Sequence, residues 1–201
     1  MKKVGVLGGT FNPIHNGHLR LAFLMKERLG LEKVLLIPSL IPPHKDAPSG
    51  ADTADRLEML KGVLSEQPFL EIEEFELGRK EKSYSYYTLK YLREKDPQAE
   101  YYFLTGSDMF LSLDRWFRSE DIMKMAIFCG VARNEDDLVL LKEKQKEYKK
   151  NGFETVVLEA EAYEISSTEI RELIAQGKDA SDYLPKSVLK VIKEKGLYGG
   201  Y

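Results

Sequence analysis

The sequence predicts a doubly wound α/β fold with a mostly parallel sheet. Short apolar runs rich in Val, Leu and Ile alternate with segments whose apolar residues follow helical spacing. Strands that recur between helices are typical of parallel sheets, because parallel neighbours need a crossover connection. At 201 residues, without an internal repeat or low-complexity linker, the chain suits one large domain. We therefore expect a single domain over residues 1–201, with C-terminal helices from about residue 166.

The first half of the chain alternates strand and helix from its start. Lys2–Leu7 is a short apolar run followed by Gly-Gly, and helical periodicity then extends from Gly17 through Leu29. Lys33–Pro38 is rich in Val, Leu and Ile, which predicts a second buried strand. Ala54–Leu64 again has helical spacing. Leu70–Leu77 alternates apolar and acidic residues, as an edge or half-exposed strand does.

The second half continues the alternation to the end of the sequence. A helical segment is closed by Asp96-Pro97, since proline ends a helix at or before the preceding residue. Another predicted helix is heavily charged, which is typical of a solvated face. The strands expected here are Glu100–Thr105, Ala126–Ala132 and Glu154–Glu159, and the helices are Tyr87–Lys95, Leu138–Lys150, Ser167–Ala175 and Lys186–Lys195.

Composition excludes several classes of partner. The formal net charge of -3 provides no general attraction to nucleic acid or to an anionic membrane, so phosphate binding requires locally placed groups. The single cysteine, Cys129, rules out an internal disulfide and fits a reducing cytosol. Residues 1–9 are too short and glycine-rich for a secretory signal, and no apolar run is long enough to span a membrane. We expect a cytoplasmic protein, with homo-oligomerisation left open.

The first strand-to-helix turn carries the clearest candidate site. In a doubly wound sheet, ligands bind beyond the carboxyl ends of the strands. The segment from Gly8 to His18 lies at such an end, where glycines without Cβ let a phosphate approach the backbone. Free N–H groups and the helix dipole favour an anion there. The segment matches neither a Walker A loop nor a G-x-G-x-x-G fingerprint.

The placement of histidines sharpens this prediction. The protein has three, His15, His18 and His44, and all lie in or beside predicted strand-to-helix loops. Imidazoles three residues apart can both direct N–H donors at one triphosphate. Zinc is the competing interpretation, but it is weak because no cysteine lies nearby and His44 is the only plausible third ligand.

Two motifs resemble those of a known superfamily. Gly-Gly-Thr-Phe-Asn-Pro-Ile-His-Asn-Gly-His at residues 8–18 is similar to the signature of the HxGH nucleotidyltransferases. Ile-Ser-Ser-Thr-Glu-Ile-Arg at residues 165–171 is similar to their ISSTxIR motif. Ser166 or Ser167 can cap the helix that starts there, whose N-terminus provides a second anion site, and Arg171 lies one turn further in. The sequence most resembles the nicotinate-nucleotide adenylyltransferase family.

The resemblance implies an ATP site built from both motifs. His15 and His18 are expected to act on the triphosphate, with His18 nearest to the α-phosphate, and Arg171 to hold the outgoing β/γ end. Backbone N–H groups of Gly9 and Thr10 are expected to add to this cradle. The residues implied in ATP binding are Gly8, Gly9, Thr10, Phe11, Lys45, Asp108, Arg133, Ser166, Ser167 and Thr168.

Segments in the middle of the chain match the family less closely. Pro-Pro-His-Lys at residues 42–45 and the pattern running from Gly106 through Asp108 to Trp116 agree with it. In the stretch that resembles SYTxDTL, Ser85 replaces threonine and Tyr87 replaces an acidic residue. Arg133 is followed by Asn-Glu, where the family more often has Pro-Gly. The residues implied in mononucleotide binding are Asn12, His44, Lys45, Tyr84, Ser85 and Trp116.

The implied reaction is adenylyl transfer from ATP to nicotinate mononucleotide, giving deamido-NAD and pyrophosphate. Mg²⁺ is expected to arrive with ATP, held mainly by phosphates and water, since no acidic cluster appears in the motifs. No protein-bound metal is expected. The alternatives are transfer to nicotinamide mononucleotide or phosphopantetheine, and a catalytically silent nucleotide-binding regulator. A fragment of a class I aminoacyl-tRNA synthetase fits poorly, because the chain has no basic excess or anticodon-binding extension.

Overall fold

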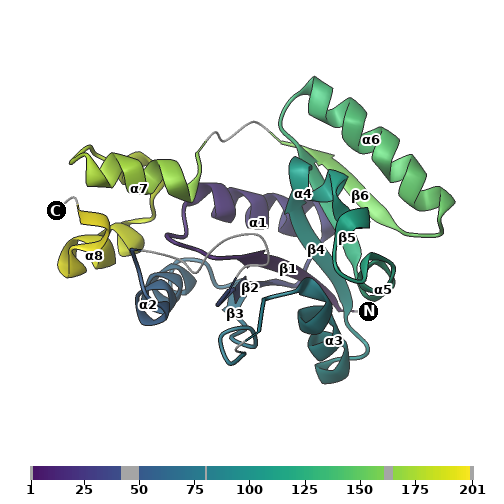
Figure 1. The fold of residues 1–201 in the computed structure, drawn as a ribbon, viewed down its shortest axis with the longest axis horizontal. Helices are drawn as coiled ribbons and strands as arrows, with labels where there is room; N and C mark the ends of the chain where they lie inside the picture. Colours follow the sequence, from purple (N-terminus) through teal and green to yellow (C-terminus); the bar gives the residue numbers. More distant parts are fainter. Residues whose placement is uncertain (1, 42–49, 80, 161–164, 200–201) are drawn as a thin grey trace. The chain divides into compact units, whose positions relative to one another are not determined.

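A computed structural model describes residues 2–41, 50–79, 81–160 and 165–199. Their strands form a six-stranded sheet in the order β3-β2-β1-β4-β5-β6 (Figure 1). The pairs β1–β4, β4–β5 and β5–β6 are all parallel. The order reverses between β1 and β4, as in a doubly wound sheet, so the predicted fold class is confirmed.

The chain divides into two compact units, which we describe separately. Unit 1 comprises residues 1–7, 24–34 and 84–163, and unit 2 comprises residues 8–23, 35–83 and 164–201. Three regular elements, β1 (Lys3–Gly9), α1 (Asn16–Leu29) and β2 (Lys33–Pro38), belong partly to each unit. A single domain over residues 1–201 stays a prediction.

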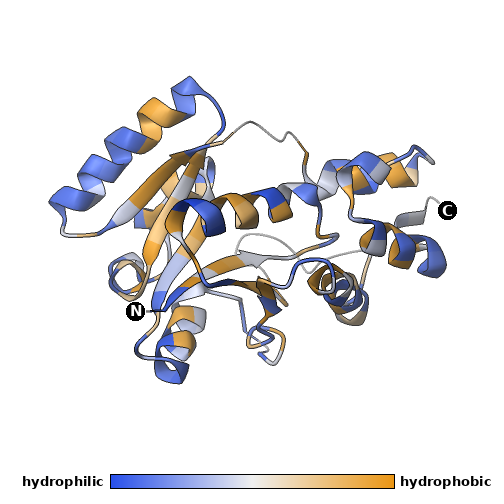
Figure 2. Cartoon of the chain, turned by 180° about the vertical axis from the view of Figure 1, so that it is seen from behind, coloured by the Kyte–Doolittle hydropathy of each residue, from blue (hydrophilic) through white to orange (hydrophobic). Residues whose placement is uncertain are grey.

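Unit 1 is built on strands β4 to β6, whose side chains form an aromatic core. Phe103 on β4 stacks on Phe128 on β5, with ring centroids 5.0 Å apart. Gly130 on β5 is required by close packing, because a Cβ there would lie 2.7 Å from the ring of Phe110. The helix α6 packs along β5 and β6, and Figure 2 shows it mostly hydrophilic with a short apolar stretch. The elements are β4 (Glu100–Gly106), β5 (Ile127–Ala132), β6 (Thr155–Glu159), α3 (Ser85–Lys95), α4 (Ser107–Leu111), η1 (Leu113–Arg115), α5 (Ser119–Met125) and α6 (Glu135–Lys150).

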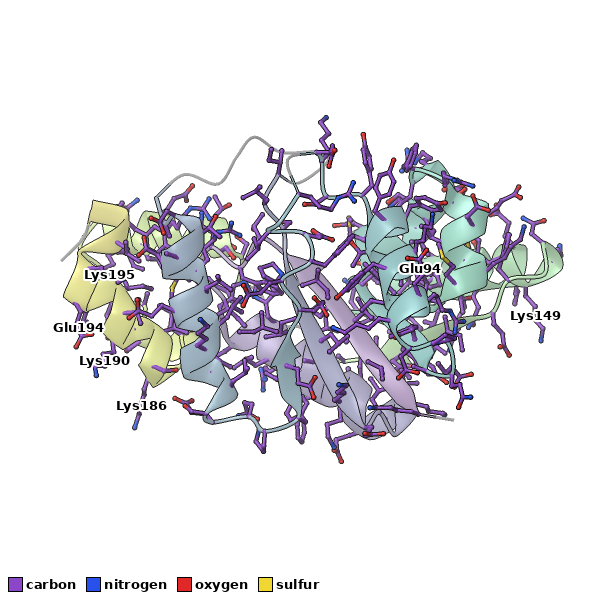
Figure 3. All side chains as sticks on the ribbon, turned by 90° about the horizontal axis from the view of Figure 1, so that it is seen from below. Glu94, Lys149, Lys186, Lys190, Glu194 and Lys195 are labelled. Carbon is purple, nitrogen blue, oxygen red and sulfur yellow. The ribbon has the colours of Figure 1, made fainter. Side chains whose placement is uncertain are left out.

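Unit 2 joins the turn after β1 to the C-terminal helices. The helix α8 packs against α2, where Lys195 forms ion pairs with Asp55 at 2.8 Å and Glu58 at 2.6 Å. Lys186 and Lys190 precede Lys195 along α8 (Figure 3). The elements are α2 (Thr53–Leu64), β3 (Leu70–Ile72), α7 (Ser167–Ala175), η2 (Ser181–Tyr183), α8 (Lys186–Lys195) and η3 (Leu197–Gly199).

Two differences from the sequence prediction have local causes. The third strand ends at Ile72 instead of Leu77, because the chain turns there with Leu77 N–H donating to the carbonyl of Glu74. Two short helices, α4 and α5, were not predicted, since five and seven residues are too few for a helical period to stand out. None of the helices in the described ranges is long and apolar enough to cross a membrane.

Candidate functional site

The loop after β1 packs around a buried phenylalanine. Phe11 is fully buried and has a φ of 48°, a left-handed conformation that costs a non-glycine residue about 1–2 kcal/mol. Its ring lies against Gly9, where a Cβ would be 3.1 Å from the phenylalanine Cε1. Gly9 therefore leaves space for the ring of Phe11. Gly8 is exposed, and Gly9 and Thr10 are partly exposed, so a ligand can reach this backbone.

His15 and His18 lie side by side at the start of α1. Their ring centroids are 3.8 Å apart, and the two ring planes are tilted relative to each other by 39°. The Nδ1 atom of His15 accepts from Gly17 N–H at 3.2 Å, and that of His18 accepts from His15 N–H at 3.3 Å. Because each Nδ1 accepts a hydrogen bond, each neutral ring carries its own proton on Nε2. The pair thus provides two imidazole N–H donors.

Burial keeps both imidazoles neutral at physiological pH. Desolvation lowers the pKa of His15 to about 4, although the carboxylate of Glu169 acts in the opposite direction. Desolvation also lowers the pKa of His18 well below its usual value, and the neighbouring His15 adds to this effect. In the free protein both side chains therefore act as neutral hydrogen-bond donors.

Acid should destabilise the protein through His15. Its folded pKa of about 4 lies below the ordinary histidine value of 6.5, so the unfolded chain takes up the proton first as the pH falls. Stability is therefore lost from about pH 6.5 down to about pH 4. Between pH 7 and pH 4.5 this linkage amounts to about 2 kcal/mol. Urea unfolding at both pH values should show a smaller loss for His15→Gln than for the wild type; equal losses would contradict the assignment.

Side chains from α2 and α7 hold the carbonyl groups of this loop. Arg56 Nη1 donates to the carbonyl of Thr10 at 2.7 Å, and Arg171 Nη1 donates to that of Asn12 at 2.8 Å. Ser167 Oγ donates to the carbonyl of Pro13 at 3.0 Å. Carbonyl oxygens repel phosphate. These three hydrogen bonds hold the three carbonyl oxygens on side-chain donors of the protein. The structure thereby brings the two sequence motifs together within unit 2.

The start of α7 is capped as the sequence predicts. Ser166 is the N-cap, and its Oγ accepts from Glu169 N–H at 3.2 Å. The carboxylate of Glu169 accepts in return from the Ser166 N–H at 2.8 Å, which completes a capping box. Thr168 Oγ1 accepts from Arg171 Nη2 at 3.2 Å, so this hydroxyl orients the guanidinium.

Unit 1 carries the other candidate residues in two places. Arg133 is exposed and its Nη2 lies 3.4 Å from the position that a Cβ on Gly106 would take, so it lies beside the end of β4. Asp108 is exposed in the first turn of α4. Tyr84 is the N-cap residue of α3, without a side-chain capping bond, and Ser85 begins that helix. His44 and Lys45 lie outside the described residues.

Trp116 is half-buried and packs edge-on against two core rings. Its ring centroid lies 5.9 Å from that of Phe103 and 5.9 Å from that of Phe128, with interplanar angles of 84° and 88°. The next residue, Phe117, is 45% exposed and lies 4.8 Å from the ring of Tyr84. The structure therefore brings Tyr84 near the loop that carries Trp116.

Sequence reasoning missed Arg56, Phe117 and Tyr198. Arg56 is a buried arginine on the amphipathic helix α2, where its spacing is that of a core residue. Tyr198 donates through its hydroxyl to Asn12 Oδ1 at 2.7 Å, from the end of the chain. No sequence signal separates either from ordinary helix or tail residues. Phe117 follows the tryptophan directly, and this adjacency of two aromatic residues was a usable signal.

These motifs and this fold define a nucleotidyltransferase: the chain belongs to the cytidylyltransferase-like family, whose model matches residues 6–173. A probable nicotinate-nucleotide adenylyltransferase of Lactococcus lactis is 38% identical over 197 residues, covering 98% of this chain and 95% of the relative. One of Clostridium tetani is 36% identical over 200 residues, covering 98% and 100%. Within the wider family, the chain therefore belongs with the nicotinate-nucleotide adenylyltransferases.

Solved structures show the same fold at lower sequence identity. The nicotinic acid mononucleotide adenylyltransferase of Plasmodium falciparum, complexed with NaAD, superposes with a TM-score of 0.76 at 18% identity. The same enzyme complexed with APC gives a TM-score of 0.75 at 17% identity. Each comparison covers 100% of this chain and 99% of the other.

Proposed function

We infer that this protein transfers the adenylyl group of ATP to nicotinate mononucleotide, forming deamido-NAD and pyrophosphate in NAD biosynthesis. The observation that carries the chemistry is the pair of neutral imidazoles His15 and His18 beside the open backbone of Gly8–Thr10. The proposed substrate is supported by the relatives, which are named probable nicotinate-nucleotide adenylyltransferases.

The reaction needs positioning more than acid–base chemistry. A phosphate monoester is already anionic near neutral pH, so an oxygen of the mononucleotide phosphate can attack the α-phosphorus of ATP without a general base. The new P–O bond forms in line with the bond to the β-phosphate, which breaks as pyrophosphate leaves with its electrons. The protein then has to align the two phosphates and neutralise charge on the pentacoordinate phosphorus.

We assign the groups of unit 2 to the triphosphate. His18 donates its Nε2–H to the α-phosphate, and His15 donates beside it. Backbone N–H groups of Gly9 and Thr10 add neutral donors. Arg171 Nη1 donates to the carbonyl of Asn12, and other N–H groups of the same guanidinium bind the β- and γ-phosphates of ATP. Charge accumulates at these phosphates as pyrophosphate departs.

A divalent metal is used with ATP in this family, and we propose Mg²⁺. In the described ranges no group of three His, Cys, Asp or Glu side chains could hold a metal ion. We propose that the ion arrives on the triphosphate and keeps phosphate oxygens and water as its ligands. The ion supplies charge neutralisation, and no step is assigned to a protein-bound metal.

The acceptor's pyridine ring is assigned to residues of unit 1. We propose that Trp116 stacks on the ring and that Tyr84 and Ser85 contact its carboxylate. Asp108, also in unit 1, is proposed to accept hydroxyls of the ATP ribose. The hydroxyl of Ser85 keeps the hydrogen bond for which the family has threonine. We further propose a cytoplasmic location, which the buried free thiol of Cys129 fits.

Trp116→Ala should raise the KM for nicotinate mononucleotide about tenfold, the scale of one lost ring contact of 1–1.5 kcal/mol. The KM for ATP should change less than threefold. Steady-state kinetics with each substrate varied in turn measures both constants. Trp116→Phe is the matched variant, because it keeps an aromatic ring against Phe103 and Phe128 and should retain most of the affinity. A rise confined to the KM for ATP would contradict this placement.

The function itself is tested by product identification. The purified protein is incubated with ATP, Mg²⁺ and either nicotinate mononucleotide, nicotinamide mononucleotide or phosphopantetheine. The products are separated and identified by mass spectrometry. Deamido-NAD with equimolar pyrophosphate is the expected result. If NAD or dephospho-coenzyme A were the main product instead, the protein's acceptor would be nicotinamide mononucleotide or phosphopantetheine. No pyrophosphate with any acceptor would identify a catalytically silent regulator.

A further inference from the structure

The tail of the chain reaches back to the nucleotide loop. Tyr198, in the turn η3 after α8, donates its hydroxyl to Asn12 Oδ1 at 2.7 Å. The two residues are 186 positions apart and belong to the same unit. Asn12 is 4% exposed and Tyr198 is half-buried, so the hydrogen bond between the tail and the loop is partly buried.

The backbone on both sides of this contact is unusual. Tyr198 has a φ of 65°, and Phe11, next to Asn12, has a φ of 48°. Among the described residues, only one other non-glycine residue, Arg118, has a positive φ. Such conformations are strained for residues other than glycine and persist only where surrounding contacts hold them. The strained tail and the strained loop are therefore held together by the interactions at Asn12.

The space for the tyrosine ring is also preformed. Gly50 lies under it, and a Cβ at that position would come within 2.9 Å of Tyr198 Cδ1. Burial raises the pKa of the Tyr198 phenol, although the guanidinium groups of Arg171 and Arg56 act in the opposite direction. The phenol therefore stays protonated, and it donates to Asn12 over the whole neutral range.

The hydrogen bond completes a set of restraints on one turn. The carbonyls of Thr10, Asn12 and Pro13 are held by Arg56, Arg171 and Ser167. Those bonds fix the main chain, and the hydroxyl of Tyr198 holds the Asn12 side chain at Oδ1. A hydroxyl that holds the amide oxygen also fixes the turn's conformation, because a rotated amide would break the bond.

We propose that Tyr198 is a positioning residue for adenylyl transfer, which keeps the Gly9–Asn12 turn in its phosphate-binding conformation through the side chain of Asn12. This inference rests on the proposed function, since the turn is assigned there to the triphosphate. Tyr198 contacts no reacting atom; it acts through the loop. A displacement of about 1 Å at a reacting centre costs up to about a hundredfold in rate, so a small loosening of the turn is measurable.

Tyr198→Phe removes the hydroxyl and keeps the ring over Gly50. With ATP and mononucleotide both saturating, kcat should fall about tenfold. Tyr148→Phe is the matched control, because Tyr148 donates to the backbone carbonyl of Phe110 at 2.9 Å within unit 1, whereas the loop belongs to unit 2. Both variants lose one hydroxyl hydrogen bond to a buried residue, and urea unfolding should show a similar small loss of stability for each. Only Tyr198→Phe should lose turnover.

A double-mutant cycle tests whether the effect passes through Asn12. In an Asn12→Ala background, Tyr198→Phe should lower kcat less than twofold further, since its partner is gone. A tenfold loss in both backgrounds, or a kcat for Tyr198→Phe within twofold of wild type, would overturn the positioning role. If the wild-type protein forms no dinucleotide, the proposed function fails instead; the wild-type assay therefore separates the two failures.

Discussion

Replacing His18 with alanine is expected to lower kcat by about 10²–10³. Loss of a single donor to a transition-state oxyanion typically has this effect. His18 fits that role because its Nδ1 accepts from the His15 N–H, which leaves the proton on Nε2. The ring also packs against Phe11, with centroids 5.1 Å apart, so its direction is fixed before substrate arrives. Turnover within about threefold of wild type would remove His18 from the reaction.

A second variant separates donation from packing. His18→Gln keeps an amide N–H donor on a side chain of similar reach and should recover part of the activity, whereas His18→Ala should not. Urea unfolding of both variants shows whether stability changes alone explain the loss of turnover. A kcat for His18→Gln well above that of His18→Ala would support a neutral hydrogen-bond donor at position 18.

The pH dependence gives an independent check on the same residue. Because burial lowers the pKa of His18 well below 6.5, the free enzyme carries no imidazolium there between pH 6 and pH 8. The kcat/KM for ATP should therefore show no step from His18 in this range. A rise in kcat/KM towards pH 6 that disappears in His18→Gln would indicate that the protonated imidazole is required, and would contradict the assignment.

The sequence was most informative where chemistry and local structure coincide. The Gly-Gly turn and paired histidines could be placed at the first strand-to-helix junction because glycines and the onset of helical periodicity mark it. A helix cap could be placed at Ser166 or Ser167 because serine is favoured at that position, and the structure selects Ser166, which forms a capping box with Glu169. In each case the signal lies within a few residues of its effect.

The sequence was least informative about contacts between distant segments. Arg56 contacts Thr10, which is 46 positions away in the sequence, and Tyr198 contacts Asn12, which is 186 positions away. Contacts at such separations produce no periodic pattern in the sequence. The strand expected from Leu70 to Leu77 ends early for a different, local reason. Its alternation continues, but the chain turns after Ile72, with Leu77 N–H donating to the carbonyl of Glu74.

Replacing Arg56 with methionine is expected to lower both stability and turnover. The guanidinium donates from Nη1 to the carbonyls of Thr10 at 2.7 Å and Ser39 at 2.8 Å. These carbonyls follow β1 and β2, so one side chain ties together two loops at the carboxyl edge of the sheet. Leaving two carbonyls unpaired costs about 1–3 kcal/mol each. Burial of the charge, which lowers the arginine pKa, offsets part of this, so we expect a net loss of about 3 kcal/mol.

Arg93 provides the matched control for that experiment. It also donates to two backbone carbonyls, from Nε to Met125 at 2.9 Å and from Nη1 to Ala99 at 2.8 Å, but within unit 1. Arg93→Met should therefore lose a comparable amount of stability in urea while kcat stays within about twofold of wild type. Arg56→Met should in addition lose at least tenfold in kcat, because the freed carbonyl of Thr10 can turn towards the phosphates and repel them. If both variants lost stability and turnover in the same proportion, Arg56 would be a structural residue only. A selective loss at Arg56 would instead show that the phosphate loop depends on a buried cation which its own sequence motif does not contain.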